Sequence, residues 1–269
     1  MLVYFPLPSY YNLVYSLFML NSITYGSFLC LLLSIAQPIH ALDGGTEAPA
    51  NAAPYVAALL SSDDAFNKCT GVLVTPQTIL TTASCVQNQT SSSLKARIGS
   101  NDRTTGGTVV NFNKIIQHPK YSTKTWDFDI ALLTLSEAAP ENVPLATIGN
   151  FSDAIGSGVT MYGWGLTNYS NTEFPEKLQK LDAIGITDAW CAEEWKGLHS
   201  ISNRMVCDWP PVEKASWEGD KGGPVVNTLD GSVVGLISFS IYETERKKAL
   251  PDVHTNLEYF NSWIKAHVA

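Results

Sequence analysis

The stretch "TGVLVTPQTILTTAS" (residues 70–84) sets the character of this chain, because it holds two short apolar runs separated by Pro76. Similar short apolar or alternating runs recur on both sides of it, and clusters of Gly, Pro, Asn and Ser separate them. These runs are "YVAALL" (55–60), "KARIGS" (95–100), "TVVNFNKIIQ" (108–117), "DIALLTL" (129–135), "GVTMYGWG" (158–165), "KLQKLDAIGI" (177–186) and "SVVGLISFS" (232–240). Many short strands with regular turns predict an all-β domain, either a sandwich or closed barrels.

Two segments break the strand pattern and predict helices. In "TNLEYFNSWIKAHV" (255–268), Thr255 and Glu258 have the spacing of a capping box, so a helix is expected to open there. Four residues then fall on one helical face: Leu257, Phe260, Ile264 and Val268. A second, shorter helix is expected to start at Thr187 or Asp188.

Composition limits the classes of function. The chain has 269 residues, of which 45 % are hydrophobic and 16 % are charged, so a packed core is expected. Its net charge of −8 argues against nucleic acid and anionic membrane surfaces, because both attract basic patches. No Gly-rich phosphate loop, paired CxxC or HExxH motif occurs in the sequence. No metal and no cofactor are expected, since the histidines lack metal-ligand spacing and suit surface or packing positions: His118, His199, His254 and His267.

The first 41 residues differ from the rest, because they contain no Asp, Glu, Lys or Arg. Within them, "SFLCLLLSIA" (27–36) has the character of a signal-peptide apolar region, with Ala36 and Ala41 as candidate cleavage sites. A start at Met19 would give a signal of ordinary length. A transmembrane anchor is the alternative, which Pro6, Pro8, Asn12 and Asn21 disfavour by interrupting the preceding apolar stretch. Residues 1–41 therefore predict a secreted, extracellular protein whose mature domain spans 42–269.

Cysteine usage fits secretion. Cys30 is lost with the signal peptide, which leaves Cys69, Cys85, Cys191 and Cys207. An even number in an extracellular chain favours two disulfides, although the sequence alone leaves three pairings open. Three N-glycosylation sequons are compatible with a glycosylated surface: Asn88, Asn150 and Asn168.

Six motifs in order resemble those of the chymotrypsin-like (trypsin-fold) serine proteases, over nearly all of the mature chain. They are "LDGG" (42–45), "LTTASC" (80–85), "DIALLTL" (129–135), "GWG" (163–165), "GDKGGPVV" (219–226) and "SWI" (262–264). The resemblance implies two six-stranded β-barrels, at about 42–150 and 151–269, with a cleft between them. The expected disulfides are Cys69–Cys85, spaced like the family's disulfide around the catalytic segment, and Cys191–Cys207.

Two positions of the family's catalytic triad are changed. The resemblance places Asp129 at the acid, Ser84 at the histidine, and Lys221 at the serine nucleophile, next to Gly219 and Asp220 in the oxyanion loop. A serine hydroxyl cannot act as a general base near neutral pH, and a protonated lysine has no lone pair for attack. We therefore expect a proteolytically inactive homologue and not an enzyme.

Loss of the histidine would leave the Asp129 carboxylate buried without a partner, which is unfavourable by several kcal/mol. Lys221 could reach across from the nucleophile position. We therefore expect an ion pair between Lys221 and Asp129, with Ser84 hydrogen-bonded beside it.

The specificity pocket of the family is also altered. Ala215 stands at its floor, and Trp217 replaces a cysteine of the disulfide that ties the pocket walls together in the family. Ser238 and Ser240 belong to one wall, and Ser240 and Asp252 stand where the family has glycines. Side chains at these two positions are expected to narrow or fill the slot.

The family's activation step is ambiguous in this chain. Cleavage after a basic residue normally frees an N-terminal ammonium, which pairs with the aspartate beside the nucleophile, here Asp220. The segment "QPIHALDGG" (37–45) offers no Lys or Arg. Signal cleavage after Ala41 would make Leu42 the amino terminus directly, whereas cleavage after Ala36 would leave Asp220 without this partner.

Within the family, the changed triad and pocket resemble those of the inactivated serine-protease paralogues of the scabies mite, relatives of the mite group 3 trypsin-like allergens. This resemblance implies a binding protein that acts against host defence, with complement proteins as the expected partners. The charged run "ETERKKA" (243–249), at the rim of the pocket, is a candidate contact. Two alternatives stay open: an active hydrolase with Ser84 as nucleophile and Lys221 as its base, and a decoy that binds protease inhibitors.

Overall fold

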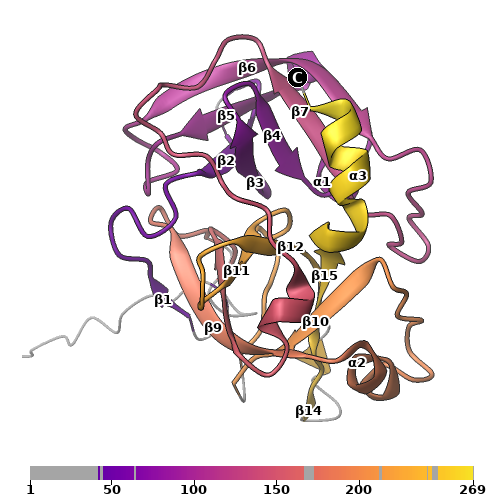
Figure 1. Ribbon diagram of the computed structural model, residues 1–269. Coiled ribbons are helices and arrows are strands. Elements are labelled where there is room, and N and C mark those ends of the chain that lie inside the picture. Colours follow the sequence, from indigo (N-terminus) through magenta and orange to yellow (C-terminus); the bar gives the residue numbers. More distant parts are fainter. Residues whose placement is uncertain are drawn as a thin grey trace, which may run out of the picture. The chain divides into compact units, whose positions relative to one another are not determined.

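The computed structural model describes residues 42, 45–63, 65–166, 173–211, 214–240, 242–243 and 248–268, which form two antiparallel β-barrels and three α-helices (Figure 1). Three features expected from the sequence lie outside the described residues: the signal peptide (1–41), the sequon at Asn168 and positions 244–247 of the charged run. Among the helices that are described, none has the length and apolar character needed to cross a membrane.

The first barrel consists of β2 (Val56–Ser61), β3 (Phe66–Thr75), β4 (Thr78–Thr81), β5 (Leu94–Ile98), β6 (Thr108–Gln117) and β7 (Ala131–Leu135). Its strand order is β2-β3-β4-β7-β6-β5, and pairing of β5 with β2 closes it. Successive side chains of a strand face opposite sides, so β5 buries Leu94, Ala96 and Ile98 in the barrel. The two apolar runs around Pro76 form β3 and β4, with Pro76 and Gln77 in the turn between them.

The second barrel consists of β8 (Gly158–Gly163), β9 (Gln179–Ile186), β10 (Met205–Trp209), β11 (Pro224–Asn227), β12 (Val233–Phe239) and β15 (Asp252–Asn256). Its order is β9-β10-β15-β12-β11-β8, and pairing of β8 with β9 closes it. The short strand β1 (Thr46–Glu47) pairs with β9, while β13 (Tyr242–Glu243) and β14 (Lys248–Ala249) form a separate two-stranded sheet. The prediction of two six-stranded barrels is confirmed.

The α-helices are α1 (Ala83–Val86), α2 (Asp188–Glu194) and α3 (Leu257–His267), and two 3-10 turns cover Ser91–Ser93 and Phe151–Ala154. The predicted start of α2 is confirmed, because the Thr187 side chain accepts the Trp190 N–H. The predicted capping box of α3 is wrong. Asn256 caps this helix by accepting the Tyr259 N–H at 3.2 Å, since Thr255 is still paired with Met205 in the sheet.

A shared hydrophobic cluster joins the two barrels. It brings Leu80 and Leu132 of the first barrel together with Trp164 and Leu236 of the second and with Phe260 of α3. The C-terminal helix therefore packs on both barrels, and Figure 1 shows it beside β7. Two disulfides are present: Cys69–Cys85 ties β3 to α1, and Cys191–Cys207 ties α2 to β10.

Candidate functional site

A cleft of about 510 Å³ lies between the barrels. Ser84 on α1 and Trp126 from the loop before β7 line it on one side, and Trp217, Lys221 and Ser240 line it on the other. The other lining residues are Cys69, Cys85, Gln87, Gln89, Ser216, Glu218, Gly219, Ile237, Ser238 and Phe239. The cleft therefore collects six of the ten positions that the resemblance assigns to the triad, the oxyanion loop and the specificity pocket.

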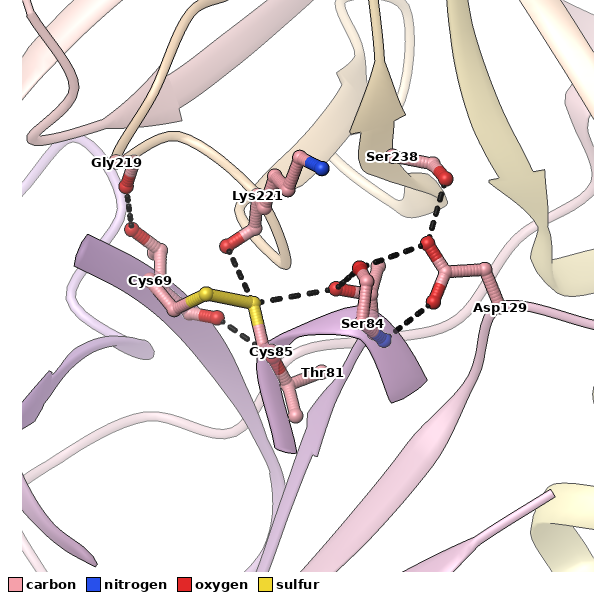
Figure 2. Close-up of a disulfide and its surroundings, with 10 residues drawn as sticks. Cys69, Thr81, Ser84, Cys85, Asp129, Gly219, Lys221 and Ser238 are labelled. Atoms are coloured by element: carbon pink, nitrogen blue, oxygen red, sulfur yellow. Dashed lines mark hydrogen bonds between the residues drawn. A yellow bond between two sulfur atoms is a disulfide. The ribbon is translucent and has the colours of Figure 1, made fainter. Parts of the chain in front are cut away.

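Asp129 is buried next to this cleft, and two serines hold its carboxylate (Figure 2). Its Oδ1 accepts the Ser84 N–H at 2.7 Å. Its Oδ2 accepts the Ser84 Oγ–H at 3.0 Å and the Ser238 Oγ–H at 2.6 Å. Burial raises the pKa of Asp129, and the hydrogen bonds from Ser238 and Ser84 oppose that rise.

Ser84 is positioned by its covalent neighbours. The Cys69–Cys85 disulfide anchors the residue that follows it to β3, and Thr82 Oγ1 donates to Cys85 Sγ at 3.2 Å. The Ser84 hydroxyl has two acceptors in reach, Asp129 Oδ2 and Thr82 Oγ1, the second at 3.1 Å. Among the described residues that line the cleft there is no imidazole to take its proton.

The expected ion pair between Lys221 and Asp129 is wrong. No ion pair to Lys221 is found in the described part of the chain, and its ammonium lies 5.6 Å from the centroid of the Trp126 ring, within cation–π range. Asp129 does not require the cation, because Ser84 and Ser238 supply three donors to it. The Lys221 charge still acts on Asp129 through space, where it lowers the pKa of that carboxyl less than the hydrogen bonds do.

A hydrogen bond joins the two walls of the altered pocket. Ser240 Oγ donates to the Ser216 carbonyl, and the Ser216 N–H donates to Asp252 Oδ2 at 2.6 Å. Ala215 and Asp252 are buried, and neither lines the cleft. This hydrogen bond spans the former slot, whose narrowing stays a prediction.

Asp220 is another buried carboxylate of this loop. It accepts the Gly165 N–H at 2.8 Å and the Trp217 N–H at 2.9 Å, and burial raises its pKa to about 7. No cation of the described chain pairs with it. Leu42, the residue that cleavage after Ala41 would expose as the amino terminus, has its side chain buried in the core of the second barrel.

One buried polar cluster was missed by the sequence reasoning. Asp208 on β10 and Asp252 and His254 on β15 are fully buried, and His254 Nε2 lies 2.9 Å from Asp208 Oδ2. Asp208 and Asp252 are paired across the two strands, so burial and then the Asp208 charge raise the pKa of Asp252. Three atoms of this cluster have no hydrogen-bond partner within the described structure: Asp208 Oδ1, Asp252 Oδ1 and His254 Nδ1. The available signal was the alternation of Asp252 and His254, which puts both side chains on one face of a strand.

The remaining site expectations fall on other parts of the surface and core. Asn88 and Asn150 are exposed, as sequons for glycosylation must be. His118 packs between the rings of Phe128 and Phe260, which is a packing position. In the ranges that the structure describes, no group of three or more His, Cys, Asp or Glu side chains is arranged to hold a metal ion.

Comparison with known proteins gives the family. A family model described as Trypsin matches residues 42–264. Anionic trypsin of Canis lupus familiaris is 33 % identical over 232 residues, covering 84 % of this chain and 89 % of that protein. Trypsin of Xenopus laevis is 31 % identical and covers 90 % and 97 %. The solved structure of neuropsin, a serine protease expressed in the limbic system of mouse brain, is similar at a TM-score of 0.73 and 25 % identity, over 82 % of this chain and 97 % of that one. This chain therefore belongs to the trypsin-like serine protease family.

Proposed function

We propose that this chain is a secreted, proteolytically inactive member of the family that works by binding another protein. The observation that carries the proposal is the surroundings of Ser84. Its hydroxyl is bonded to Asp129, and the cleft offers no described imidazole that could activate a nucleophile. Lys221, at the position that the resemblance assigns to the nucleophile, presents an ammonium over Trp126.

The same geometry argues against a rearranged hydrolase. A Ser84–Lys221 dyad needs a neutral lysine amine that accepts the serine proton. The acceptors of the Ser84 hydroxyl are instead Thr82 and Asp129, and no hydrogen bond joins it to Lys221 in the described structure. The backbone donors of Gly219 and Lys221 also surround the Lys221 position and not Ser84, so an oxyanion formed at Ser84 would lack them.

The decoy alternative meets a different obstacle. Macromolecular inhibitors of this family insert a side chain into the specificity slot. Here the Ser240–Ser216 hydrogen bond spans that slot, and Ala215 at its floor lies outside the cleft. Titration with a macromolecular trypsin inhibitor is expected to show no binding.

Host defence proteins, and complement proteins first among them, are the partners we propose. The resemblance to the inactivated paralogues of the scabies mite supports this class. Two disulfides and exposed sequons at Asn88 and Asn150 suit a protein that works outside cells. A pull-down from host serum with the mature protein tests the class of partner, and capture of no defence protein would count against it.

Labelling with a fluorophosphonate probe tests inactivity. We expect the mature protein to stay unlabelled beside an active trypsin. The double variant Ser84→His/Lys221→Ser restores both side chains of the triad next to Asp129, so it serves as the matched positive control. Labelling of the unaltered protein that disappears in Ser84→Ala would reveal a rewired enzyme and overturn the proposal.

A further inference from the structure

We infer that the cleft binds a carboxylate group, held by the ammonium of Lys221 and by the backbone N–H groups of Gly219 and Lys221. This inference rests on the proposed function, because a ligand held in this way is bound and not turned over. It assigns a chemical class of ligand to three donors of one loop that lines the cleft.

The two N–H groups point away from the loop's own contacts. The Glu218 carbonyl accepts the Leu166 N–H at 2.8 Å, and the Asp220 carbonyl accepts the Gly223 N–H at 2.9 Å. In a trans peptide the N–H is directed opposite to the preceding carbonyl, and no cis peptide occurs in the described chain. Neither the Gly219 nor the Lys221 N–H has an acceptor among the described residues, and both residues line the cleft. Two donors are therefore available to a ligand.

The loop that presents these donors is fixed against the first barrel. Thr70 Oγ1 donates to the Gly219 carbonyl at 3.3 Å, and the Thr70 N–H donates to the Lys221 carbonyl at 2.8 Å. Gly219 has a φ of +101°, and a Cβ on it would lie 2.7 Å from the Cα of Gly165. This conformation therefore requires glycine. The donors are held in place before a ligand arrives, which reduces the entropy lost on binding.

Lys221 brings a positive charge to the same cleft. Its half-buried side chain reaches over Trp126, which also lines the cleft. Asp129 does not contact this ammonium directly, because Ser84 and Ser238 donate to its carboxylate. A charge in a partly desolvated cleft attracts an anion more strongly than a charge in bulk water. Glu218 is exposed at the rim, so its negative charge disfavours a ligand with a second anionic group there.

A carboxylate matches this donor set. Backbone N–H groups and a nearby cation form charge-assisted hydrogen bonds to its two oxygens, which is how proteins capture peptide C-termini. The Ser240–Ser216 bond spans the slot, so a peptide that ends here fits better than one whose next side chain must pass this bond. The ligand is therefore the C-terminal carboxylate of a peptide, and an acidic side chain within a peptide is the other source of the same chemistry.

Three matched peptides test this site on the mature protein: acetylated pentaalanine with a free C-terminal carboxylate, the same peptide as its amide, and the amide with one internal aspartate. The amide signals of Gly219 and Lys221 in ¹⁵N–¹H spectra report binding. We expect the free acid to shift both signals and the plain amide to shift neither. Lys221→Gln removes the charge but keeps the backbone donors, and we expect it to weaken binding of the acid about tenfold.

Lys196→Gln is the matched control, because Lys196 is exposed, pairs with Glu193 on α2 and does not line the cleft. It should bind the acid as the unaltered protein does. Equal binding of acid and amide, or unchanged affinity in Lys221→Gln, would overturn the inference. Binding of the aspartate peptide alone would support the carboxylate and assign the side-chain source.

Two further measurements keep the test decisive. Should Lys221→Gln fail to fold, the salt dependence of acid binding by the unaltered protein takes its place, since an ionic contact weakens as salt rises. Insensitivity to salt would then overturn the inference. Fluorophosphonate labelling remains a separate readout. Labelling would overturn the proposed inactivity, whereas absence of carboxylate binding in an unlabelled protein would overturn this inference alone.

Discussion

Ser238 is the side chain on which the charged form of Asp129 most depends. Its 2.6 Å hydrogen bond is the largest of the influences that oppose the burial of that carboxyl. Ser238→Ala leaves a buried acceptor short of a donor, which costs about 1–3 kcal/mol of unfolding free energy. An acid whose pKa is raised in the folded state stabilises the fold at low pH and loses this contribution as pH rises. Because the variant raises the pKa of Asp129 further, urea unfolding should show a larger loss at about pH 8 than at about pH 5.

Ser262→Ala is the control for this measurement, since Ser262 is exposed on α3. It should leave the unfolding free energy unchanged at both pH values. An equal loss at both pH values for Ser238→Ala would contradict the proposed link between this bond and the ionisation of Asp129.

Residue roles could be predicted from the sequence only in part. The order of motifs placed Ser84, Asp129 and Lys221 in one site, and Ser84 does contact Asp129. The partner of Lys221 was predicted incorrectly, because the sequence does not show which hydroxyl groups donate to Asp129. Ser238 comes from the other barrel and Trp126 from a loop, so neither contact follows from spacing along the chain.

At the level of elements, β10 and β15 pair so that two acids, Asp208 and Asp252, lie opposite each other. Burial and the Asp208 charge raise the pKa of Asp252. The free energy of unfolding therefore falls as pH rises, because the folded state resists ionisation of this carboxyl. Asp252→Asn keeps an acceptor for the Ser216 N–H but removes this charge. The variant should therefore lose less stability than the unaltered protein between about pH 5 and 8. Chemical unfolding of both proteins at the two pH values measures this difference.

Asp208→Asn changes the opposite member of the same pair and serves as its control. This substitution weakens the contact with His254 at 2.9 Å, so it should stabilise less than Asp252→Asn or destabilise. If both variants gave the same gain, the two carboxylates would be equivalent, and the geometry around Asp252 would not explain the effect.

Strand predictions succeeded where one face of the strand is apolar and the run is long. The predicted run 108–117 is β6 without change, and 129–135 contains β7. The strands β10 and β15 escaped prediction, because buried Asp208, Asp252 and His254 interrupt the apolar pattern that marks a strand. Helix α3 was predicted from its apolar face. Its start was misplaced because Thr255 is paired in the sheet and does not cap the helix.

In the whole molecule, hydrogen bonds to Asp129 connect the two barrels. Ser238 and Thr255 of the second barrel donate to the side chain and to the carbonyl of Asp129, which precedes β7 of the first. Thr70 of the first barrel binds the loop that carries Lys221. Hydrogen bonds from serine and threonine therefore tie the two barrels together around the cleft.

Whether the mature chain begins at Leu42 should set the pH dependence of the whole fold through Asp220. With residues retained before Leu42, burial holds the pKa of Asp220 at about 7. Stability should then fall as pH rises from about 4 to above 7, by roughly 4 kcal/mol in all. A chain starting at Leu42 carries an α-ammonium that can pair with Asp220, as the family resemblance implies, which lowers this pKa and flattens the decline. Chemical unfolding of the two forms across this pH range measures the difference. Asp220→Asn should flatten the profile of the longer form, and equal slopes in both forms would show that the Leu42 terminus does not reach Asp220.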